Sequence, residues 1–220
     1  MYSKGFQKPV ISNRLIQRLL QHESFYVTTR PPSPPSTPPV ARDAIVDLLS
    51  SLFAMNPANA SQPSHIIPLA RIYTGTLSWS VLQLRSIFEQ FEAHRSLSIA
   101  PLFTHWTANK TGSPNNLLDA LTSVDPALAM KTCTNFSSTA TSDHLDTASG
   151  AKIYDPRFLI SLLSGVLVKA DSMNHLDWVN LFRTNVVSVA LRALAAGEDD
   201  VRELAAQTLF VLGHSLKVRL

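Results

Sequence analysis

The residues of this sequence whose types could support catalysis do not form a complete catalytic motif. Residues 213–215, Gly-His-Ser, resemble the first half of a G-x-S-x-G nucleophile elbow. However, position 217 is Lys, and the apolar spacing predicts a helix instead of the strand that precedes an elbow. Asp143, His144 and Asp146 match a catalytic triad only in composition, because nothing in this Ser- and Thr-rich stretch would orient them. We therefore expect that the protein is not an enzyme.

Metal, nucleotide and disulfide sites are not expected either. The seven histidines are isolated, so no helical turn carries the pair that a zinc-protease motif needs. The seven glycines lie too far apart to form a phosphate-binding loop. Cys133 is the lone cysteine, which excludes an intramolecular disulfide and favours a reducing compartment, and no neighbouring base would activate its thiol. We expect no cofactor and no small-molecule substrate.

Charge points to a limited set of candidate RNA contacts. Lys and Arg number 19 against 16 Asp and Glu, and a net charge of +3 is too small to make a nucleic-acid-binding protein by itself. Arg14 and Arg18 lie four positions apart on one face of a predicted helix, and Lys217 and Arg219 lie near the carboxyl end. The alternative is a solvated helix face, because no aromatic residue alternates with these charges to stack on bases.

The elements that would carry these residues are predicted to be helices. Apolar residues recur at spacings of three and four, and no segment alternates with period two, so the fold class is all-α. Asp125-Pro126 and Asp155-Pro156 each place a capping side chain before a proline, which predicts helix starts. Three apolar stripes are expected to face the core: Ile11, Leu15, Ile16, Leu19 and Leu20, capped by Ser12 or Asn13; Ile45, Leu48, Leu49, Leu52 and Phe53; and Leu84, Ile87, Phe88 and Phe91, capped by Ser78.

The last 40 residues predict two helices that pack closely. The first has Gly197 as its C-cap, and Trp178 is expected in the core just before it. The expected stripes are Val187, Ala190, Leu191 and Leu194 on the first helix, and Val201, Leu204, Ala205, Thr208, Leu209 and Leu212 on the second. Such a pair, with a Gly-acidic turn, is typical of an armadillo/HEAT-like α-solenoid. A four-helix bundle could use the same pieces, and no repeat of fixed period decides between them.

The chain is predicted to have three parts. Residues 1–28 form an N-terminal helical segment, residues 29–40 form a proline-rich linker, and residues 41–220 form the helical-repeat domain. An irregular Ser- and Thr-rich loop is expected over residues 137–152. The longest uncharged stretch, residues 48–70, is interrupted by prolines, so we expect no membrane partner.

Two strings of the sequence are familiar, QPSHI-x-PL from residue 62 and YDP-x-FL from residue 154. Through them the chain, from about Asn13 to Leu212, resembles the C-terminal domain of the nucleolar pre-ribosomal-associated protein 1 family, fungal members above all. The residues that match these motifs, for which a structural role is expected, are Gln62, Pro63, Ser64, His65, Tyr154, Asp155 and Pro156. Family members are much longer, so the resemblance implies a fragment or a broken gene model.

The resemblance implies a non-enzymatic helical scaffold in ribosome biogenesis. It would act in assembly of the large ribosomal subunit and processing of its precursor rRNA, in the nucleus and nucleolus. Its partners would be proteins of the pre-ribosomal particle, with precursor rRNA and small nucleolar RNA as further partners. Two alternatives remain: a direct RNA-binding module, and a cytoplasmic armadillo-type adaptor. The adaptor would need regularly spaced Asn and Trp, and Trp79, Trp106 and Trp178 show no such period.

Overall fold

The fold is built from helices, as the apolar spacing predicts. The structure is a computed structural model that describes residues 9–29, 40–96, 103–104, 106, 116–135 and 153–217. Within these residues the only extended pairing is one isolated antiparallel bridge, between Thr76 and Tyr154. The described chain divides into two compact units, residues 1–74 with 78–106 and residues 75–77 with 107–220, which we call the first and the second unit.

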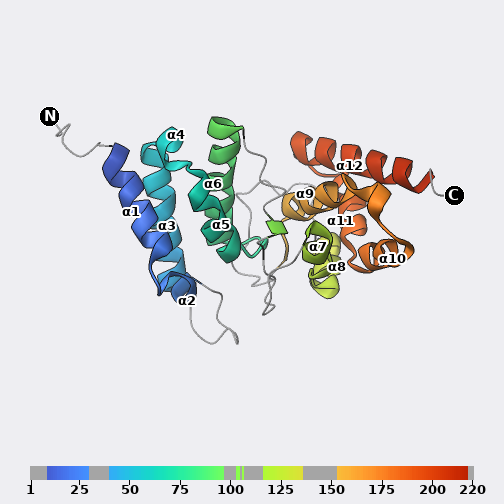
Figure 1. The fold of residues 1–220 in the computed structure, drawn as a ribbon. Coiled ribbons are helices and arrows are strands. Elements are labelled where there is room, and N and C mark those ends of the chain that lie inside the picture. The colour runs from blue at the N-terminus through green and yellow to red at the C-terminus, as the bar shows by residue number, and fades with distance from the viewer. Residues whose placement is uncertain are drawn as a thin grey trace. The chain divides into compact units, whose positions relative to one another are not determined.

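The first unit contains six of the labelled helices (Figure 1). They are α1 (Pro9–Gln21), α2 (Phe25–Thr29), α3 (Val40–Met55), α4 (Pro57–Ala60), α5 (Pro63–Ile72) and α6 (Trp79–Arg95). Helix α3 packs against α6 and α1, and α1 also packs against α4 and α5. Within this unit α1, α3 and α6 lie side by side.

The core of the first unit is aromatic and aliphatic. Phe53 of α3 lies 5.6 Å from Phe91 of α6 between ring centroids, and both rings are fully buried. The predicted stripe of α6 is confirmed, because Leu84, Ile87, Phe88 and Phe91 are all buried. Arg42 is buried too, and its Nη2 donates a hydrogen bond to the Ile72 carbonyl at the end of α5, 3.1 Å away. A cation at this position complements the negative end of the α5 dipole.

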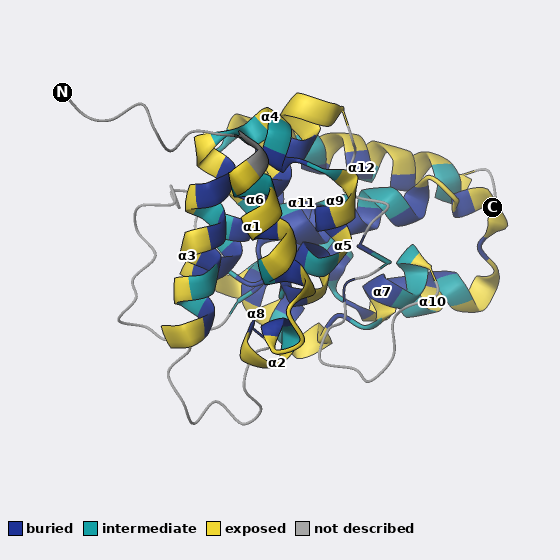
Figure 2. Ribbon diagram, turned by 60° about the vertical axis from the view of Figure 1, so that its left-hand side comes forward, coloured by how far each residue is buried: buried dark blue, intermediate teal, exposed yellow. Residues whose placement is uncertain are grey.

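The second unit is centred on one helix that is buried on most sides. Its helices are α7 (Leu117–Thr122), α8 (Pro126–Asn135), α9 (Pro156–Leu167), α10 (His175–Arg183), α11 (Val186–Ala193) and α12 (Asp199–Lys217), with a 3₁₀ turn at Ala170–Ser172. Eight residues of α9 are buried, and this helix packs against α7, α11 and α12. Helix α11 also packs against α8, and α10 packs against α7 (Figure 2).

Both predicted Asp-Pro helix starts are confirmed. Asp125 Oδ1 accepts a hydrogen bond of 2.9 Å from the Ala127 amide at the start of α8. Asp155 accepts one of 3.0 Å from the Arg157 amide at the start of α9. In each case the proline is the first helical residue, where its missing N–H leaves no helical hydrogen bond unmade.

Two of the predicted stripes are correct only in part, because some of their residues are exposed. In α1, which begins at Pro9 and not at a Ser12 or Asn13 cap, Ile11 and Leu15 are exposed and only Ile16 and Leu20 are fully buried. In α11 the buried residues are Val186, Val189, Ala190 and Ala193, whereas Leu191 and Leu194 are exposed. Leu48 of α3 is likewise exposed. In each helix, packing of neighbouring helices selects one face from several apolar ones.

The turn between α11 and α12 also differs from the prediction. Helix α11 ends at Ala193 with Leu194 as its C-cap in a right-handed conformation, so Gly197 does not supply a left-handed cap. The stripe expected on α12 is confirmed at Val201, Ala205, Thr208 and Leu212, which are buried, whereas Leu204 and Leu209 are only half-buried. Trp178 is also in the core, as predicted, with 7% of its surface exposed.

Only some of the predicted segments fall within the described residues. Most of the proline-rich linker, residues 30–39, and the whole loop 137–152 lie outside them. Thr29 ends α2 and Val40 begins α3, so both ends of the predicted linker are helical. Residues 9–29 pack into the first unit, and a boundary between units falls within the predicted domain 41–220. None of the described helices has the length and apolar character needed to cross a bilayer.

Candidate interaction surfaces

The candidate basic face of α1 is exposed. Arg14 and Arg18 point to the side opposite the buried Ile16 and Leu20, as the four-residue spacing predicts. Ile11 shares this outer side and is 53% exposed, so the face combines cationic and apolar side chains. Such a face offers charge for phosphate contact and apolar area for a partner at the same place.

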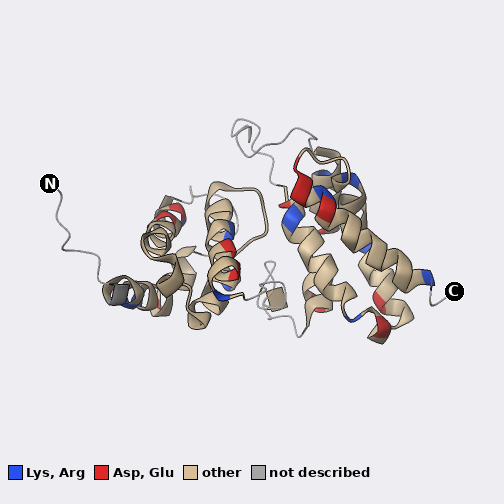
Figure 3. Ribbon diagram, turned by 90° about the horizontal axis from the view of Figure 1, so that it is seen from above, with Lys and Arg blue, Asp and Glu red and all other residues tan. Residues whose placement is uncertain are grey.

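The other candidate RNA contacts lie at the opposite end of the sequence. Lys217 is exposed at the last residue of α12, where a cation also complements the helix dipole (Figure 3). Arg219 lies outside the described residues. Arg14 and Arg18 belong to the first unit and Lys217 to the second, so the structure describes them as separate features.

The QPSHI string forms the corner between α4 and α5. Gln62 is the N-cap residue of α5, and its Nε2 donates to the Asn59 carbonyl, 2.8 Å away. His65 is buried, with Nδ1 2.8 Å from the Ala60 carbonyl oxygen, and burial lowers the pKa of its imidazole. Pro63 and Ser64 are exposed at the first turn of α5. The corner is held by backbone contacts and presents no reactive constellation.

Arg95, the last residue of α6, forms hydrogen bonds with the backbone of this corner. Arg95 donates from Nε to the Ser61 carbonyl at 3.1 Å and from Nη2 to the Ala58 carbonyl at 2.9 Å. Two hydrogen bonds from one guanidinium fix the α4–α5 corner against the end of α6. These hydrogen bonds hold the backbone at Ala58 and Ser61, directly before the string that begins at Gln62.

The YDP string joins three segments of the second unit. The Tyr154 amide donates to Thr132 Oγ1 at 2.9 Å, and the Tyr154 hydroxyl accepts from the Asp125 amide at 3.2 Å. Burial raises the pKa of this hydroxyl. The Asp155 amide donates to the Gly75 carbonyl at 2.7 Å, and Pro156 is buried at the start of α9. Backbone hydrogen bonds, the Tyr154 hydroxyl and the Asp155 cap of α9 thus fix the string within the second unit.

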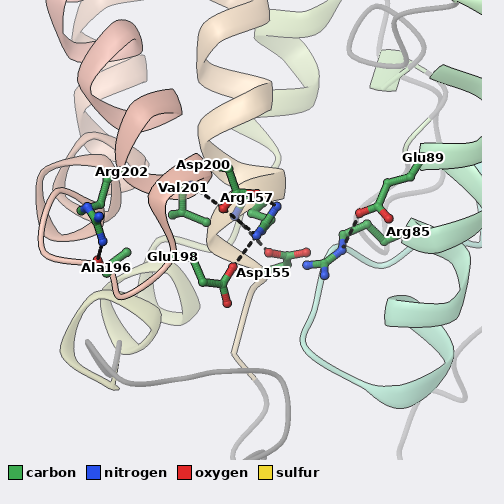
Figure 4. A network of polar contacts seen from close by, with 9 residues as sticks. All are labelled: Arg85, Glu89, Asp155, Arg157, Ala196, Glu198, Asp200, Val201 and Arg202. Carbon is green, nitrogen blue, oxygen red and sulfur yellow. Dashed lines mark hydrogen bonds and ion pairs between the residues drawn. The ribbon is translucent and has the colours of Figure 1, made fainter. Parts of the chain in front are cut away.

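Arg157 forms the most concentrated charge network of the second unit. Its guanidinium pairs with Glu198 and Asp200, which flank the first residue of α12, and Nη2 lies 2.9 Å from Asp200 Oδ1 (Figure 4). Burial opposes the positive charge, but the hydrogen bond to Glu198 and the charges of Asp200 and Glu198 outweigh it and raise the pKa of Arg157. The network ties the start of α9 to the start of α12.

Arg42, Arg71, Arg85 and Arg157 are scattered singly along the sequence, and Arg85 and Arg157 have carboxylate partners. Arg157 has two carboxylates, and Arg85 pairs with Glu89 one turn along α6, with 3.4 Å between Nε and Oε1. Arg42 instead binds the Ile72 carbonyl; burial lowers the pKa of its guanidinium, and the neighbouring Asp43 opposes that shift. Arg71 lies over the Tyr26 ring, 5.8 Å from its centroid. A helix end and an aromatic face thus replace carboxylates at two of the four positions.

Among the residues considered for catalysis, those that the structure describes have ordinary structural surroundings. Residues 213–215 lie inside α12, and the Ser215 hydroxyl donates to the Val211 carbonyl at 3.0 Å, so no elbow forms. The Cys133 thiol donates to the Ser188 carbonyl at 3.5 Å. Asp143, His144 and Asp146 fall outside the described residues. Among the residues that are described, no group of three His, Cys, Asp or Glu side chains could hold a metal ion.

Sequence reasoning missed an exposed apolar surface on α10 and α11. Its members are large side chains that the predicted stripes placed inside or left unassigned, with exposures from 44% to 64%: Leu176, Val179, Phe182, Leu191 and Leu194. We call these five residues the α10–α11 apolar surface. Leu191 and Leu194 differ from the prediction through the register of α11, whereas the three residues on α10 belonged to no predicted stripe.

Comparison with known proteins adds no assignment. No protein-family model, curated protein or solved structure matches the chain at a significant level. The function of the chain is therefore inferred from the exposure and charge of its described surfaces.

Proposed function

We propose that the chain is a non-enzymatic helical scaffold in ribosome biogenesis, acting in large-subunit assembly and precursor rRNA processing in the nucleus and nucleolus. Three observations support the proposal: the resemblance carried by the strings at residues 62–69 and 154–159, the all-helical architecture, and exposed apolar side chains. Scaffolds of this kind need extended surfaces and no catalytic centre.

An armadillo/HEAT-like organisation is part of the proposal. In the second unit α9 packs against both α7 and α12, while α11 packs against α8 and also against α9 and α12. Two stacked layers, with α7, α9 and α12 in one and α8 and α11 in the other, would give these contacts. Stacked helical pairs give such a pattern because each pair contacts its neighbours.

The α10–α11 apolar surface is the observation that carries the scaffold proposal. Phe182 on α10 and Leu191 on α11 are 44% and 56% exposed, although the interior of the same unit accommodates Trp178 and Leu181. Several large apolar side chains exposed on two helices that pack against each other are costly to hydrate, and such surfaces typically mark protein interfaces. Proteins of a pre-ribosomal particle are the partners that we propose for it.

Sedimentation of the tagged chain with large-subunit precursors tests this function. Leu191→Asp with Leu194→Asp should shift the chain from precursor fractions to the top of the gradient. Both side chains are exposed, so the variant should keep the fold, which circular dichroism checks. Val27→Asp with Met55→Asp, at exposed positions of the first unit, is the matched control and should still sediment with precursors. A parent chain that never enters those fractions would refute the scaffold proposal.

Direct RNA contact is the second candidate function, and the exposure of Arg14 and Arg18 favours it. Two cations on one helix face can replace only a few phosphate counterions, so the contact would be weak and sensitive to salt. We place it alongside the scaffold role, as an additional contact to precursor rRNA.

A further inference from the structure

The outer face of α12 is apolar at its centre and charged at both ends. Phe210 is 77% exposed, on the side of the helix opposite the buried Ala205 and Leu212. Glu203 lies seven positions before Phe210 and Lys217 lies seven positions after it, and both are exposed. Because two helical turns contain about 7.2 residues, all three side chains lie on one face.

This face is complementary to itself. When two copies of a helix pair in antiparallel fashion about a two-fold axis at Phe210, each residue faces the one equally far on the other side of that axis. Glu203 of one copy then faces Lys217 of the other, and the same pair forms again at the opposite end. The two Phe210 rings meet in the middle.

The neighbours of Phe210 leave room for such a partner. Position 213 is a glycine at which an added Cβ would meet no atom within 4 Å. No side chain therefore projects from the helix at this position beside the Phe210 ring. Position 206, one turn before the ring, is an exposed alanine. The partner ring can therefore lie against the backbone of α12 without displacing a side chain.

We propose that the protein self-associates through this face, as an antiparallel α12–α12 pair with Phe210 on the two-fold axis. The inference is independent of the scaffold function, which uses the α10–α11 apolar surface. One helix face is small compared with the roughly 1,600 Å² of a standard interface, so the dimer dissociates in the micromolar range or above.

Charge reversal with restoration tests the proposal on the full chain. Sedimentation velocity over a range of concentrations should show a monomer–dimer equilibrium for the parent. Glu203→Lys should weaken it about tenfold, because it places like charges together at both ends of the pair. The combined Glu203→Lys and Lys217→Glu variant should restore it to within about threefold of the parent. Val168→Glu, at a position 82% exposed in the same unit, is the control and should leave the equilibrium unchanged.

Cross-linking tests the register separately. In a Cys133→Ser background, Gln207→Cys places the two thiols about 9 Å apart along the paired helices, whereas Asp199→Cys places them about 33 Å apart. A short bismaleimide should therefore link the first variant into a dimer and leave the second monomeric. A parent that stays monomeric at every concentration, a double variant as weak as the single one, or equal cross-linking at both positions would overturn the proposal.

Discussion

The ring of Phe158 occupies the space that a side chain on Gly75 would need. A Cβ built on Gly75 would lie 2.4 Å from Phe158 Cε1, and the glycine has a φ of +70°, which L side chains rarely adopt. The two residues are held together by the hydrogen bonds around the Thr76–Tyr154 bridge, including the one of 2.9 Å from the Leu77 amide to the Ile153 carbonyl. Close packing and backbone conformation therefore both require glycine at this position.

Gly75→Ala should destabilise the protein by about 2 to 4 kcal/mol, because the methyl group both clashes with a buried ring and strains the backbone. Gly213→Ala is the matched control, since an added Cβ there meets open space inside a helix. It should stabilise by about 0.5 to 1 kcal/mol. Urea unfolding of both variants at low protein concentration measures the difference. Equal effects of the two substitutions would contradict the assignment of Gly75.

Trp178→Ala should cost about 3 to 5 kcal/mol of unfolding free energy, because a large buried side chain is removed from the core of the second unit. Its ring lies 6.5 Å from that of Phe182 between centroids. Trp79→Ala is the comparison: Trp79 is 61% exposed, and its indole N–H donates to Asp47 Oδ1 at 3.0 Å. That variant should lose about 1 kcal/mol or less. A loss below about 1 kcal/mol for Trp178→Ala would show that the ring is not in the core.

Arg157→Met should destabilise by about 1 to 2 kcal/mol, because Glu198 and Asp200 lose a partly buried cation that both of them bind. Arg85→Met removes a single ion pair within one helix and should cost about 0.5 kcal/mol or less. Thermal unfolding in low and high salt distinguishes the two, since only the first variant should reduce the salt sensitivity of the parent appreciably. Equal melting temperatures of the two variants would argue against the network.

Stability should fall as the pH drops below about 6.5, in part because of His65. Burial lowers the pKa of this imidazole from its ordinary value of 6.5, so the unfolded chain takes up a proton first. The stability contributed by the neutral ring is present above 6.5 and is lost as the pH falls toward the folded-state pKa. His65→Gln should reduce the slope of unfolding free energy against pH between 6.5 and 5. The substitution His94→Gln, at an exposed position, is the control, and an unchanged slope in His65→Gln would contradict the expectation.

Reversing Arg14 and Arg18 to Glu should reduce cross-linking of the chain to precursor rRNA and lower the salt dependence of RNA binding. Association with the large-subunit particle should remain, because the proposed protein contacts lie elsewhere. Lys131→Glu with Arg183→Glu makes the same change of charge at exposed positions of the second unit and should leave cross-linking as in the parent. Equal loss in both variants would assign the effect to net charge and not to the face of α1.

Local signals predicted much of the fold. The Asp-Pro pairs before α8 and α9 act through capping groups within the first turn, so the sequence nearby is sufficient to predict them. The buried face of α12 is equally local, because Val201, Ala205, Thr208 and Leu212 recur at spacings of three and four. By contrast, α11 has apolar residues on several faces, and only its packing against α8, α9 and α12 decides that Val189 is buried and Leu191 is exposed.

The candidate surfaces divide in the same way, into those that local spacing predicts and those that depend on packing. The exposure of Arg14 and Arg18 follows from their spacing, and the structure confirms it. The fit of Phe158 against Gly75 depends on residues brought together from distant parts of the chain. The α10–α11 apolar surface depends on which face of each helix packs against its neighbours. No spacing rule relates such positions, so only a three-dimensional arrangement reveals them.

The bridge at Thr76 also constrains how the protein can be synthesised and divided. Residues 75–77 lie between α5 and α6 in the sequence but belong to the second unit, so that unit is discontinuous along the chain. During translation this short segment is synthesised well before residues 153–155, so its hydrogen bonds to Ile153 and Asp155 cannot form until those residues are present. A fragment that begins at residue 107 would lack the backbone partners of Ile153 and Asp155 and would leave one side of Phe158 uncovered. No single cut of the chain therefore yields two intact halves.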